Sequence, residues 1–429
     1  MKGERKTVRL GEVTSWTSGG TPSKGNPEFW NGDIPWISAS SMKTPHLCDS
    51  DLKITKAGLN NGSRLADTNS ILLLVRGSEL HKRIPVGIAT KPVAFNQDVK
   101  ALQVRGEIRS DYLFYWLLGN ERMLLGRVEH TGIGAGKLDT EVLKNLPIAL
   151  PSLAHQKAIA AVLGGLDAKI ELNRRMNATL EAMARALFRS WFVDFNPVRV
   201  KLDSRKPVSL EETDAALFPA TFQDSPLGNI PNGWEVSTIG AKLSTILGGT
   251  PARAKPEYWT HGTVAWINSG KTNEFRIIEP SEWITKEALD NSATKLLPQR
   301  TTVLAITGAT LGQVSITEIE CCANQSVVAI LASKQLPTEF IYPWIEENIE
   351  KLIASQTGGA QQHINKGNVE ELALLCPDSR VVAAYQAKVK PLFDQIAANC
   401  FQSHTLATLR DTLLPKLLSG ELSVANLRN

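Results

Sequence analysis

The stretch GGTPSKGNPEFWNGDIPWIS at residues 19–38 returns half a chain later, at residues 248–268, as GGTPARAKPEYWTHGTVAWIN. Both versions contain Gly-Gly-Thr-Pro, then Pro-Glu-aromatic-Trp, and then Trp-Ile. The correspondence continues: Asn96-Gln97 matches Asn324-Gln325, and the separation falls slowly from 229 to 226 residues along the chain. A slowly falling separation is typical of small loop insertions in a common fold. The chain is therefore predicted to hold two copies of one domain, each followed by a helical segment.

Length and composition describe a globular protein of two domains. The 429 residues exceed what one hydrophobic core usually supports, and 42% of them are hydrophobic and 21% charged. The charged N-terminus lacks the apolar segment of a secretory signal, and no apolar run is long enough to span a membrane. Five scattered cysteines, an odd number, favour reduced thiols. We therefore expect a cytoplasmic protein, whose net charge of +4 permits nucleic-acid binding without requiring it.

Secondary-structure signals are similar in the two copies. Short apolar runs ended by turn residues, such as 70–77 and 301–308, predict strands, whereas 111–128 and 339–355 have helical apolar spacing. Each copy is thus predicted to be an α+β domain with an antiparallel, barrel-like sheet. The expected segments are a first domain at 1–150, a central helix at 151–195, a linker at 196–232, a second domain at 233–376 and a distal helix at 377–429.

Two long helices are predicted after the two domains. Residues 154–193 contain no proline, and apolar residues recur there every three or four positions. This pattern predicts one helix of roughly 40 residues and about 60 Å, which needs a partner helix to cover its apolar face. The second copy supplies the partner, with a beginning or kink expected near Pro391 and an end near Pro415. The predicted pairing positions are Ile170, Asn173, Leu180 and Leu187, matched 226 residues later by Ile396, Asn399, Leu406 and Leu413.

The asparagines Asn173 and Asn399 have two interpretations. In the seam of a coiled coil, a buried asparagine costs stability but fixes register and pairing. Alternatively, both lie exposed on a curved helix. The first helix also ends in an apolar cluster that is either core or an interface with another protein. This cluster consists of Leu187, Phe188, Trp191 and Phe192.

The sequence contains no recognisable catalytic or metal-binding motif. The string SGKT at 269–272 is like the end of a phosphate loop, but Ala265 stands where that loop requires glycine. The seven histidines lack the spacing of a metal site or a catalytic triad. We therefore expect a binding protein with no catalytic residue and no metal or cofactor of its own.

Three further segments accompany the repeat. They are LPIALPSLAHQKAIAAVLGGLDAKIELN at 146–173, FRSWFVDFNPV at 188–198 and LFPATFQDSPLGNIPNGWEV at 217–236. In this order, and with the two-fold repeat, nearly the whole chain resembles the DNA-specificity subunit of type I restriction–modification enzymes. One departure is His155, where the family usually has glutamate, which puts the capping or packing role of that glutamate in doubt here.

This resemblance implies two target-recognition domains, each reading one short DNA half-site in the major groove. It also implies that the two long helices pair antiparallel, with pseudo-two-fold symmetry, and act as a ruler between the half-sites. Such a subunit is expected to be non-catalytic. Its implied partners are double-stranded DNA, two modification subunits that methylate adenine with S-adenosylmethionine, and restriction subunits. ATP and Mg²⁺ are likewise expected on the partner subunits.

The candidates for DNA contact are polar and basic residues on loops between strands, because such side chains can bind base edges or phosphates. In the first copy they are Thr21, Lys24, Ser38, Ser40, Lys43, Arg76, His81, Lys82, Arg83 and Lys137. In the second copy they are Thr250, Arg253, Lys255, Asn268, Lys271, Thr307, Gln361 and Gln362. The basic loop from Arg76 to Arg83 is the strongest candidate, because it follows an apolar strand and is an insertion relative to the second copy. The alternative for each residue is a solvated loop charge.

Two other functions stay open at this point. The same two-domain layout could serve as a protein-interaction scaffold that does not bind DNA, and weak salt dependence of binding would indicate this. A less favoured alternative is an enzyme whose active site is assembled between the copies. Methylation or cleavage by the chain alone would indicate that function.

Overall fold

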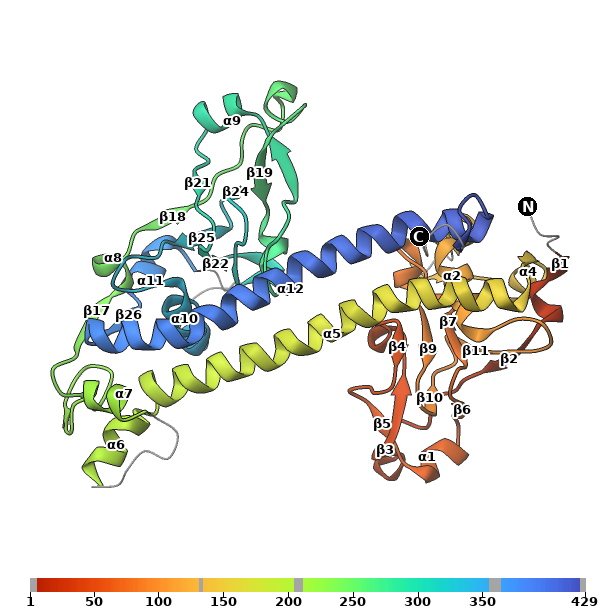
Figure 1. Cartoon of the computed structure of the whole chain (residues 1–429), viewed down its shortest axis with the longest axis horizontal. Helices are drawn as coiled ribbons and strands as arrows, with labels where there is room; N and C mark the ends of the chain where they lie inside the picture. The colour runs from red at the N-terminus through yellow and green to blue at the C-terminus, as the bar shows by residue number, and fades with distance from the viewer. Residues whose placement is uncertain (1–5, 131–133, 204–210, 355–363, 425–429) are drawn as a thin grey trace. The chain divides into compact units, whose positions relative to one another are not determined.

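The structure is a computed structural model that describes residues 6–130, 134–203, 211–354 and 364–424. By internal contacts the chain divides into two compact units: residues 1–170 with 405–429 form the first, and residues 171–404 form the second. Two long helices, α5 (Leu153–Phe192) and α12 (Ser379–Ser419), each contribute one part to each unit (Figure 1). Each unit therefore combines a domain of mixed helix and sheet with segments of both helices.

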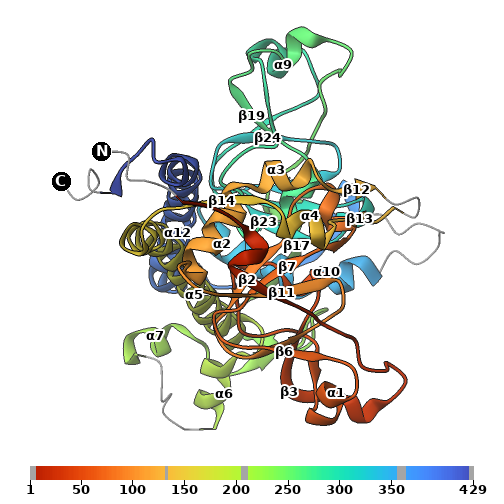
Figure 2. The same ribbon diagram turned by 90° about the vertical axis from the view of Figure 1, so that its right-hand side faces the viewer.

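The first unit contains two main sheets. The five-stranded sheet has the order β2-β11-β7-β9-β4, and the four-stranded sheet has the order β5-β3-β10-β6. In Figure 2, β3 and β6 lie with α1 at one end of this unit. The strands are β1 (Lys6–Arg9), β2 (Thr14–Ser18), β3 (Trp30–Ile37), β4 (His46–Leu47), β5 (Lys53–Ile54), β6 (Arg64–Ala66), β7 (Ile71–Leu74), β8 (Arg76–Gly77), β9 (Val86–Ala89), β10 (Val93–Phe95), β11 (Val99–Val104), β12 (Glu129–His130), β13 (Gly136–Lys137) and β14 (Pro147–Leu150). The helices are α1 (Lys56–Asn60), α2 (Ser110–Gly119), α3 (Glu121–Leu125) and α4 (Thr140–Lys144).

The second unit repeats this plan. Its sheets have the orders β18-β25-β22-β23 and β20-β19-β24-β21. The strands are β15 (Phe222–Gln223), β16 (Ile230–Pro231), β17 (Glu235–Thr238), β18 (Thr245–Leu247), β19 (Val264–Ile267), β20 (Glu282–Ile284), β21 (Leu296–Leu297), β22 (Thr302–Ala305), β23 (Val314–Ile316), β24 (Cys321–Ala323), β25 (Val327–Ile330) and β26 (Ala373–Cys376). The helices are α6 (Asn196–Leu202), α7 (Glu212–Leu217), α8 (Ile239–Lys242), α9 (Lys286–Asp290), α10 (Thr338–Ala354) and α11 (Lys366–Glu371).

The two repeated α+β domains are confirmed, but the antiparallel, barrel-like sheet expected in each is replaced by two open sheets. Strands β3 and β10 pair in parallel, as do β19 and β24, and no sheet in the described part of the chain closes on itself. The reason is the repeated sequence. The Gly-Gly-Thr-Pro turn connects β2 to β3, and the Asn-Gln turn connects β10 to β11, so both turns carry the chain from one sheet to the other. The strands on either side of each turn therefore belong to different sheets.

Both long helices exist, but the second is longer than its prolines suggest. Helix α12 begins at Ser379, well before Pro391, and continues past Pro415 to Ser419. A proline removes only one intrahelical hydrogen bond, and buried neighbours hold the helix at this point: Val389 and Phe393 belong to the core of the second unit. The expectation of a helix beginning near Pro391 is therefore wrong, whereas the observed end at Ser419 lies close to the expected one at Pro415.

Polar contacts join the two helices within each unit. In the second unit, Asn399 Nδ2 donates to Asn177 Oδ1 (2.8 Å), and Asn173 Nδ2 donates to Ser403 Oγ (3.2 Å). Rising numbers on α5 meet falling numbers on α12, so these segments run antiparallel. All three asparagines are buried, so the exposed alternative does not hold. In the first unit the corresponding contact is the bond from Arg410 to Asp167 (2.7 Å).

The aliphatic pairing positions are buried to different degrees. Ile396 is fully buried. The half-buried positions are Ile170, Leu180, Leu187, Leu406 and Leu413. Leu187 packs against the core of the second unit and Leu413 against that of the first. The stripe therefore also joins each helix to a domain core.

Asn399→Leu is expected to lower the unfolding free energy by about 1–3 kcal/mol, because the buried Asn177 loses its donor. The double variant Asn177→Leu with Asn399→Leu should recover most of this loss, since both polar groups are then gone. Urea denaturation of the full chain measures Asn177→Leu, Asn399→Leu and the double variant. Simple addition of the two single losses in the double variant would contradict the coupling.

The aromatic cluster at the end of α5 is core. Phe188, Trp191 and Phe192 are each about 1% exposed, and the Phe192 ring lies 4.9 Å from Phe340 and 5.0 Å from Tyr385. The interface alternative is therefore wrong for this cluster. Residues 196–232 also contribute to this core, through Val198 and Phe218 among others, and so they are more than a surface linker.

Candidate nucleic-acid interface

The repeated Gly-Gly turn lies directly against the Asn-Gln turn in both units. A side chain at Gly19 would bring its Cβ to 2.2 Å from the Asn96 carbonyl oxygen, and one at Gly248 to 2.1 Å from that of Asn324. Only glycine allows this approach. The amide of the second glycine then donates to the strand opposite, from Gly20 to Phe95 O (2.9 Å) in the first unit, and in the same way in the second.

Tryptophans hold this turn in place. Trp36 Nε1 donates to Gly20 O (3.0 Å), and Trp266 Nε1 donates to Gly249 O (3.1 Å). In both units a second tryptophan meets the first edge-on, with ring centroids 5.3 Å apart. The aromatic residues of the repeated stretch therefore hold the backbone of the turn in both units.

A threonine–glutamine bond follows in each turn. Thr21 Oγ1 donates to Gln97 Oε1 (2.6 Å), and Thr250 Oγ1 donates to Gln325 Oε1 (2.5 Å). Both glutamines are exposed. The two threonines were among the predicted contact residues, and the two glutamines were not. Their signal was in the sequence, because the Asn-Gln pair is part of the repeat.

The strand ends beside these turns correspond in the two units. Val75 N donates to Asp98 O (2.8 Å), and Ile306 N donates to Ser326 O (2.9 Å). The residue that follows each of these is a predicted site residue, Arg76 in the first unit and Thr307 in the second. Equivalent backbone positions thus carry an arginine in the first unit and a threonine in the second.

In the first unit, a cavity of about 380 Å³ opens at this place. Arg76, Gln97, Lys100 and Lys137 line it. Arg76 and Lys137 are opposite each other in the pair of strands β8 and β13. The structure therefore brings together Arg76, Lys137 and, through Gln97, Thr21, although they lie far apart in the sequence.

The charges around this cavity are mixed. Lys137 Nζ lies 3.6 Å from Glu129 and 3.7 Å from Asp139. Burial lowers the pKa of Lys100, and the nearby charge of Lys144 lowers it further. Arg76 is exposed and has no side-chain partner within the described residues. Arg76 is therefore the cation of this cavity best placed to bind a ligand.

The other predicted residues of the first unit do not gather here. Arg83 is half-buried, donates to Glu79 (3.1 Å) and to Met42 O (3.3 Å), and lines a separate cavity with Lys43. Ser38 and Ser40 hydrogen-bond to each other (2.9 Å). His81 Nε2 lies 3.0 Å from the Gly134 carbonyl oxygen. Lys24, Lys43 and Lys82 are exposed on loops.

In the second unit, most predicted residues are engaged within the fold. Arg253 forms two bonds to Glu282 (2.6 and 2.7 Å), and its guanidinium lies 3.6 Å from the Trp259 ring centroid. Lys255 donates to the Tyr258 hydroxyl (3.1 Å), Lys271 pairs with Glu274 (2.7 Å), and Asn268 caps a short helical turn through Gly270 N (2.9 Å). Gln361 and Gln362 lie outside the described residues.

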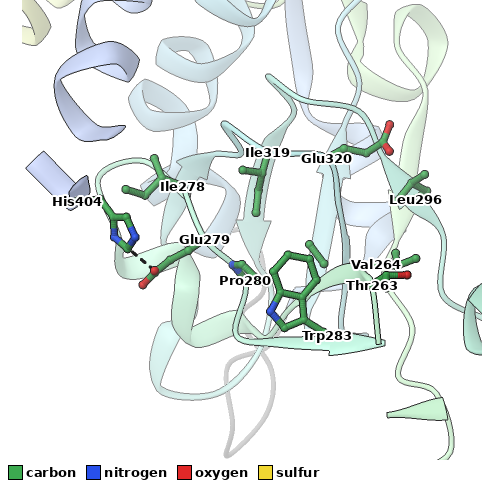
Figure 3. A pocket seen from close by; sticks show the side chains of 11 residues that line it. Thr263, Val264, Ile278, Glu279, Pro280, Trp283, Leu296, Ile319, Glu320 and His404 are labelled. Carbon is green, nitrogen blue, oxygen red and sulfur yellow. Dashed lines mark ion pairs between the residues drawn. The ribbon is translucent and has the colours of Figure 1, made fainter. Parts of the chain in front are cut away.

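The second unit has a hollow of about 520 Å³ that is lined by none of the predicted residues. Figure 3 shows Trp283 and Ile319 on its wall and His404 facing Glu279, with 3.5 Å between Nδ1 and Oε2. Within the described ranges, no group of three or more His, Cys, Asp or Glu side chains could hold a metal ion. No described helix is both long and apolar enough to cross a membrane.

Residues 2–182 and 231–387 match the family model of the type I restriction modification DNA specificity domain. The chain belongs to this family. It is 27% identical, over 99% of its length and 94% of the relative's, to the type I restriction enzyme MjaIX specificity subunit of Methanocaldococcus jannaschii. It is 34% identical to the EcoR124I/EcoR124II specificity subunit of Escherichia coli, over 39% of this chain and 42% of that one.

A solved structure shows the same fold. The S subunit of a type I restriction–modification system from M. genitalium superposes with a TM-score of 0.59 at 14% identity, covering 97% of this chain and 96% of that one. As a member of the specificity-domain family, the chain has a role in DNA sequence recognition, and this role is not catalytic. Two matched regions fit a target of two parts.

Proposed function

We propose that this chain reads a bipartite DNA target for a type I restriction–modification complex, one half-site per recognition domain. The observation that carries this proposal is the difference between two equivalent sites. The equivalent backbone position carries Arg76 in the first unit and Thr307 in the second. Likewise Lys100, which pairs with Ser18 across β11 and β2, corresponds to Val328, which pairs with Leu247. Different side chains at equivalent positions of the two domains are suited to reading different base sequences.

The chemistry of base recognition follows from these side chains. A guanidinium such as that of Arg76 can donate two hydrogen bonds to O6 and N7 of guanine in the major groove. A threonine such as Thr307 offers a hydroxyl that both donates and accepts, and a methyl group that can contact thymine. The first domain is thus suited to a half-site that contains guanine.

The partners belong to the same proposal. Two modification subunits would bind this chain and methylate adenine with S-adenosylmethionine, and restriction subunits with ATP and Mg²⁺ would join them. This chain would contribute the DNA contacts and bind no cofactor itself. The complex would act in the cytoplasm, where its DNA is.

A methylation map tests this function. The chain is expressed with its modification subunit in a host that lacks adenine methylation, and methylated adenines are mapped across the genome. We expect a split motif of two short half-sites around a fixed, unread spacer. Exchange of residues 1–150 for those of a relative should change one half-site only. A stable complex that methylates nothing would favour the scaffold alternative, and methylation by the chain alone would favour the enzyme.

Arg76→Ala is expected to weaken binding of the cognate duplex by about 1–3 kcal/mol, because the contact with one base pair is lost. On a duplex with a scrambled first half-site, the same substitution should have little effect. Thr307→Ala is the matched variant, and its loss should depend on the second half-site instead. Fluorescence anisotropy of the assembled complex measures these affinities. Equal losses on cognate and random DNA would make Arg76 a phosphate contact.

A further inference from the structure

The glutamine of the Asn-Gln turn is an exposed polar group that the two units share. Gln97 and Gln325 occupy equivalent positions, each accepts a bond from a threonine, and each follows an asparagine packed against glycine. The neighbours differ: Asp98 corresponds to Ser326, and Arg76 to Thr307. The glutamine and its threonine partner are therefore constant, whereas these neighbouring residues vary.

The turn that carries each glutamine is rigid. Asn96 Oδ1 accepts from the Asp98 amide (3.2 Å), and Asn324 Oδ1 accepts from the Ser326 amide (3.2 Å). The next amide also closes the turn, from Val99 to Asn96 O (3.3 Å) in the first unit, with the equivalent bond in the second. The backbone of the glutamine is thus fixed before any ligand binds, which lowers the entropic cost of a contact.

In both units the threonine hydroxyl pairs with Oε1 of the glutamine, which leaves the Nε2 end for a ligand. The Thr21 hydroxyl gives its proton to Gln97 Oε1, which directs the amide nitrogen of Gln97 away from the threonine. Nothing within the described residues accepts a hydrogen bond from Nε2 of Gln97 or of Gln325. Each turn therefore presents an NH₂ group with two donors and no charge. Such a group is suited to an acceptor oxygen.

We propose that Gln97 and Gln325 each donate a hydrogen bond to a DNA phosphate, at the equivalent place in the two half-sites. This inference rests on the proposed function. If the two domains read different sequences, a group that is the same in both cannot distinguish those sequences. The sugar–phosphate backbone is present in every half-site, so its acceptor oxygens are available to the same NH₂ group in both domains. The two contacts set the register of each domain on its half-site, while Arg76 and Thr307 read bases.

The test uses the complex of the full chain with its modification subunits. Binding is measured on four duplexes: the cognate target, the target with the first half-site scrambled, the target with the second scrambled, and random DNA. Gln97→Ala and Gln325→Ala are each expected to weaken binding about tenfold on all four, because a hydrogen bond to a charged oxygen is lost. The methylated motif should stay unchanged. The slope of affinity against salt should also stay unchanged, because the lost group carries no charge.

Uncharged linkages in the DNA backbone identify the phosphate that each glutamine contacts. Methylphosphonate linkages are placed one at a time along each half-site. One linkage in the first half-site should weaken the wild-type complex but not Gln97→Ala, and the equivalent linkage in the second half-site should behave this way for Gln325→Ala. Gln97→Glu preserves size and places a carboxylate near the phosphate, so it should bind more weakly than Gln97→Ala on every duplex.

Three outcomes overturn the inference. Unchanged binding of both alanine variants would show that the glutamines do not contact DNA. A variant whose motif changes within one half-site would make that glutamine a base contact. A wild-type complex without preference among the four duplexes would overturn the proposed function as well, which distinguishes the two failures. Because both glutamines are exposed, thermal unfolding of the variants should match the wild type. For a variant with a lowered midpoint, the methylphosphonate comparison still decides whether the glutamine contacts a phosphate.

Discussion

Arg276→Met is expected to lower the unfolding free energy of the second unit by about 3–5 kcal/mol, the usual cost of removing one partner from a buried ion pair. The Arg276 side chain is fully buried. Its Nη2 lies 2.8 Å from Glu181 on α5, and its Nη1 donates to the Phe275 carbonyl oxygen (2.7 Å). Methionine would keep much of the packing against Tyr342 and Phe393, but it would leave Glu181 without its principal cation.

A second carboxylate makes this loss depend on pH. Glu318 is fully buried and lies 2.8 Å from Arg300 and 3.8 Å from Arg276. Burial raises the pKa of Glu318 to about 7, although both arginines oppose this shift. A raised carboxyl pKa means that folding becomes less favourable as the pH rises from the unfolded value of 4.5 toward 7. Without Arg276 this pKa rises further, so the loss caused by Arg276→Met should be larger at pH 8 than at pH 5.5.

Hydrogen–deuterium exchange within the second unit tests this prediction. Peptides that cover β22 and β25 report its opening free energy at both pH values. Arg253→Met is the matched control, because the Arg253–Glu282 pair has similar bonds but is about half exposed, and such a pair contributes about 0–1 kcal/mol. A loss for Arg276→Met no larger than that for Arg253→Met would contradict the assignment of Arg276 as a buried anchor.

Gly19→Ala is expected to lower the unfolding free energy of the first unit by about 3 kcal/mol, at the upper end of the cost of overpacking. The new Cβ would lie 2.2 Å from Asn96 O and 2.3 Å from Phe95 O. Both are backbone atoms, so relief requires movement of the whole turn between β10 and β11. Since that turn carries Gln97, DNA binding should fall even at temperatures where the variant is folded.

Gly25→Ala provides the control in the same loop. Its Cβ would meet only the Ser23 hydroxyl, 3.9 Å away, and Gly25 is not among the residues with positive φ. We expect its thermal midpoint and DNA affinity to match those of the wild type. If both glycine variants behave alike, the close approach of the two turns is not what holds this domain together.

The amino-acid sequence by itself determined the plan of the molecule. Duplication is visible because the residues that shape the crossover between sheets, Gly19, Gly20 and Trp36, have direct counterparts in the second copy. The strand at Ile71–Leu74 and the helix at Leu153–Phe192 follow from apolar runs and periodicity, which are local properties. The family resemblance rests on the order of such segments and is confirmed by the family match.

Only the tertiary structure decided which polar residues are available to a ligand. Arg253 and Lys271 look like Arg76 in the sequence, yet each is held by a carboxylate, and in the case of Lys271 one partner is eight residues away. The sheet pairing, the length of α12 through Pro391 and the burial of Asn173 depended equally on distant partners. Sequence spacing records local preferences, whereas burial and ion pairing depend on residues that meet only when the chain is folded.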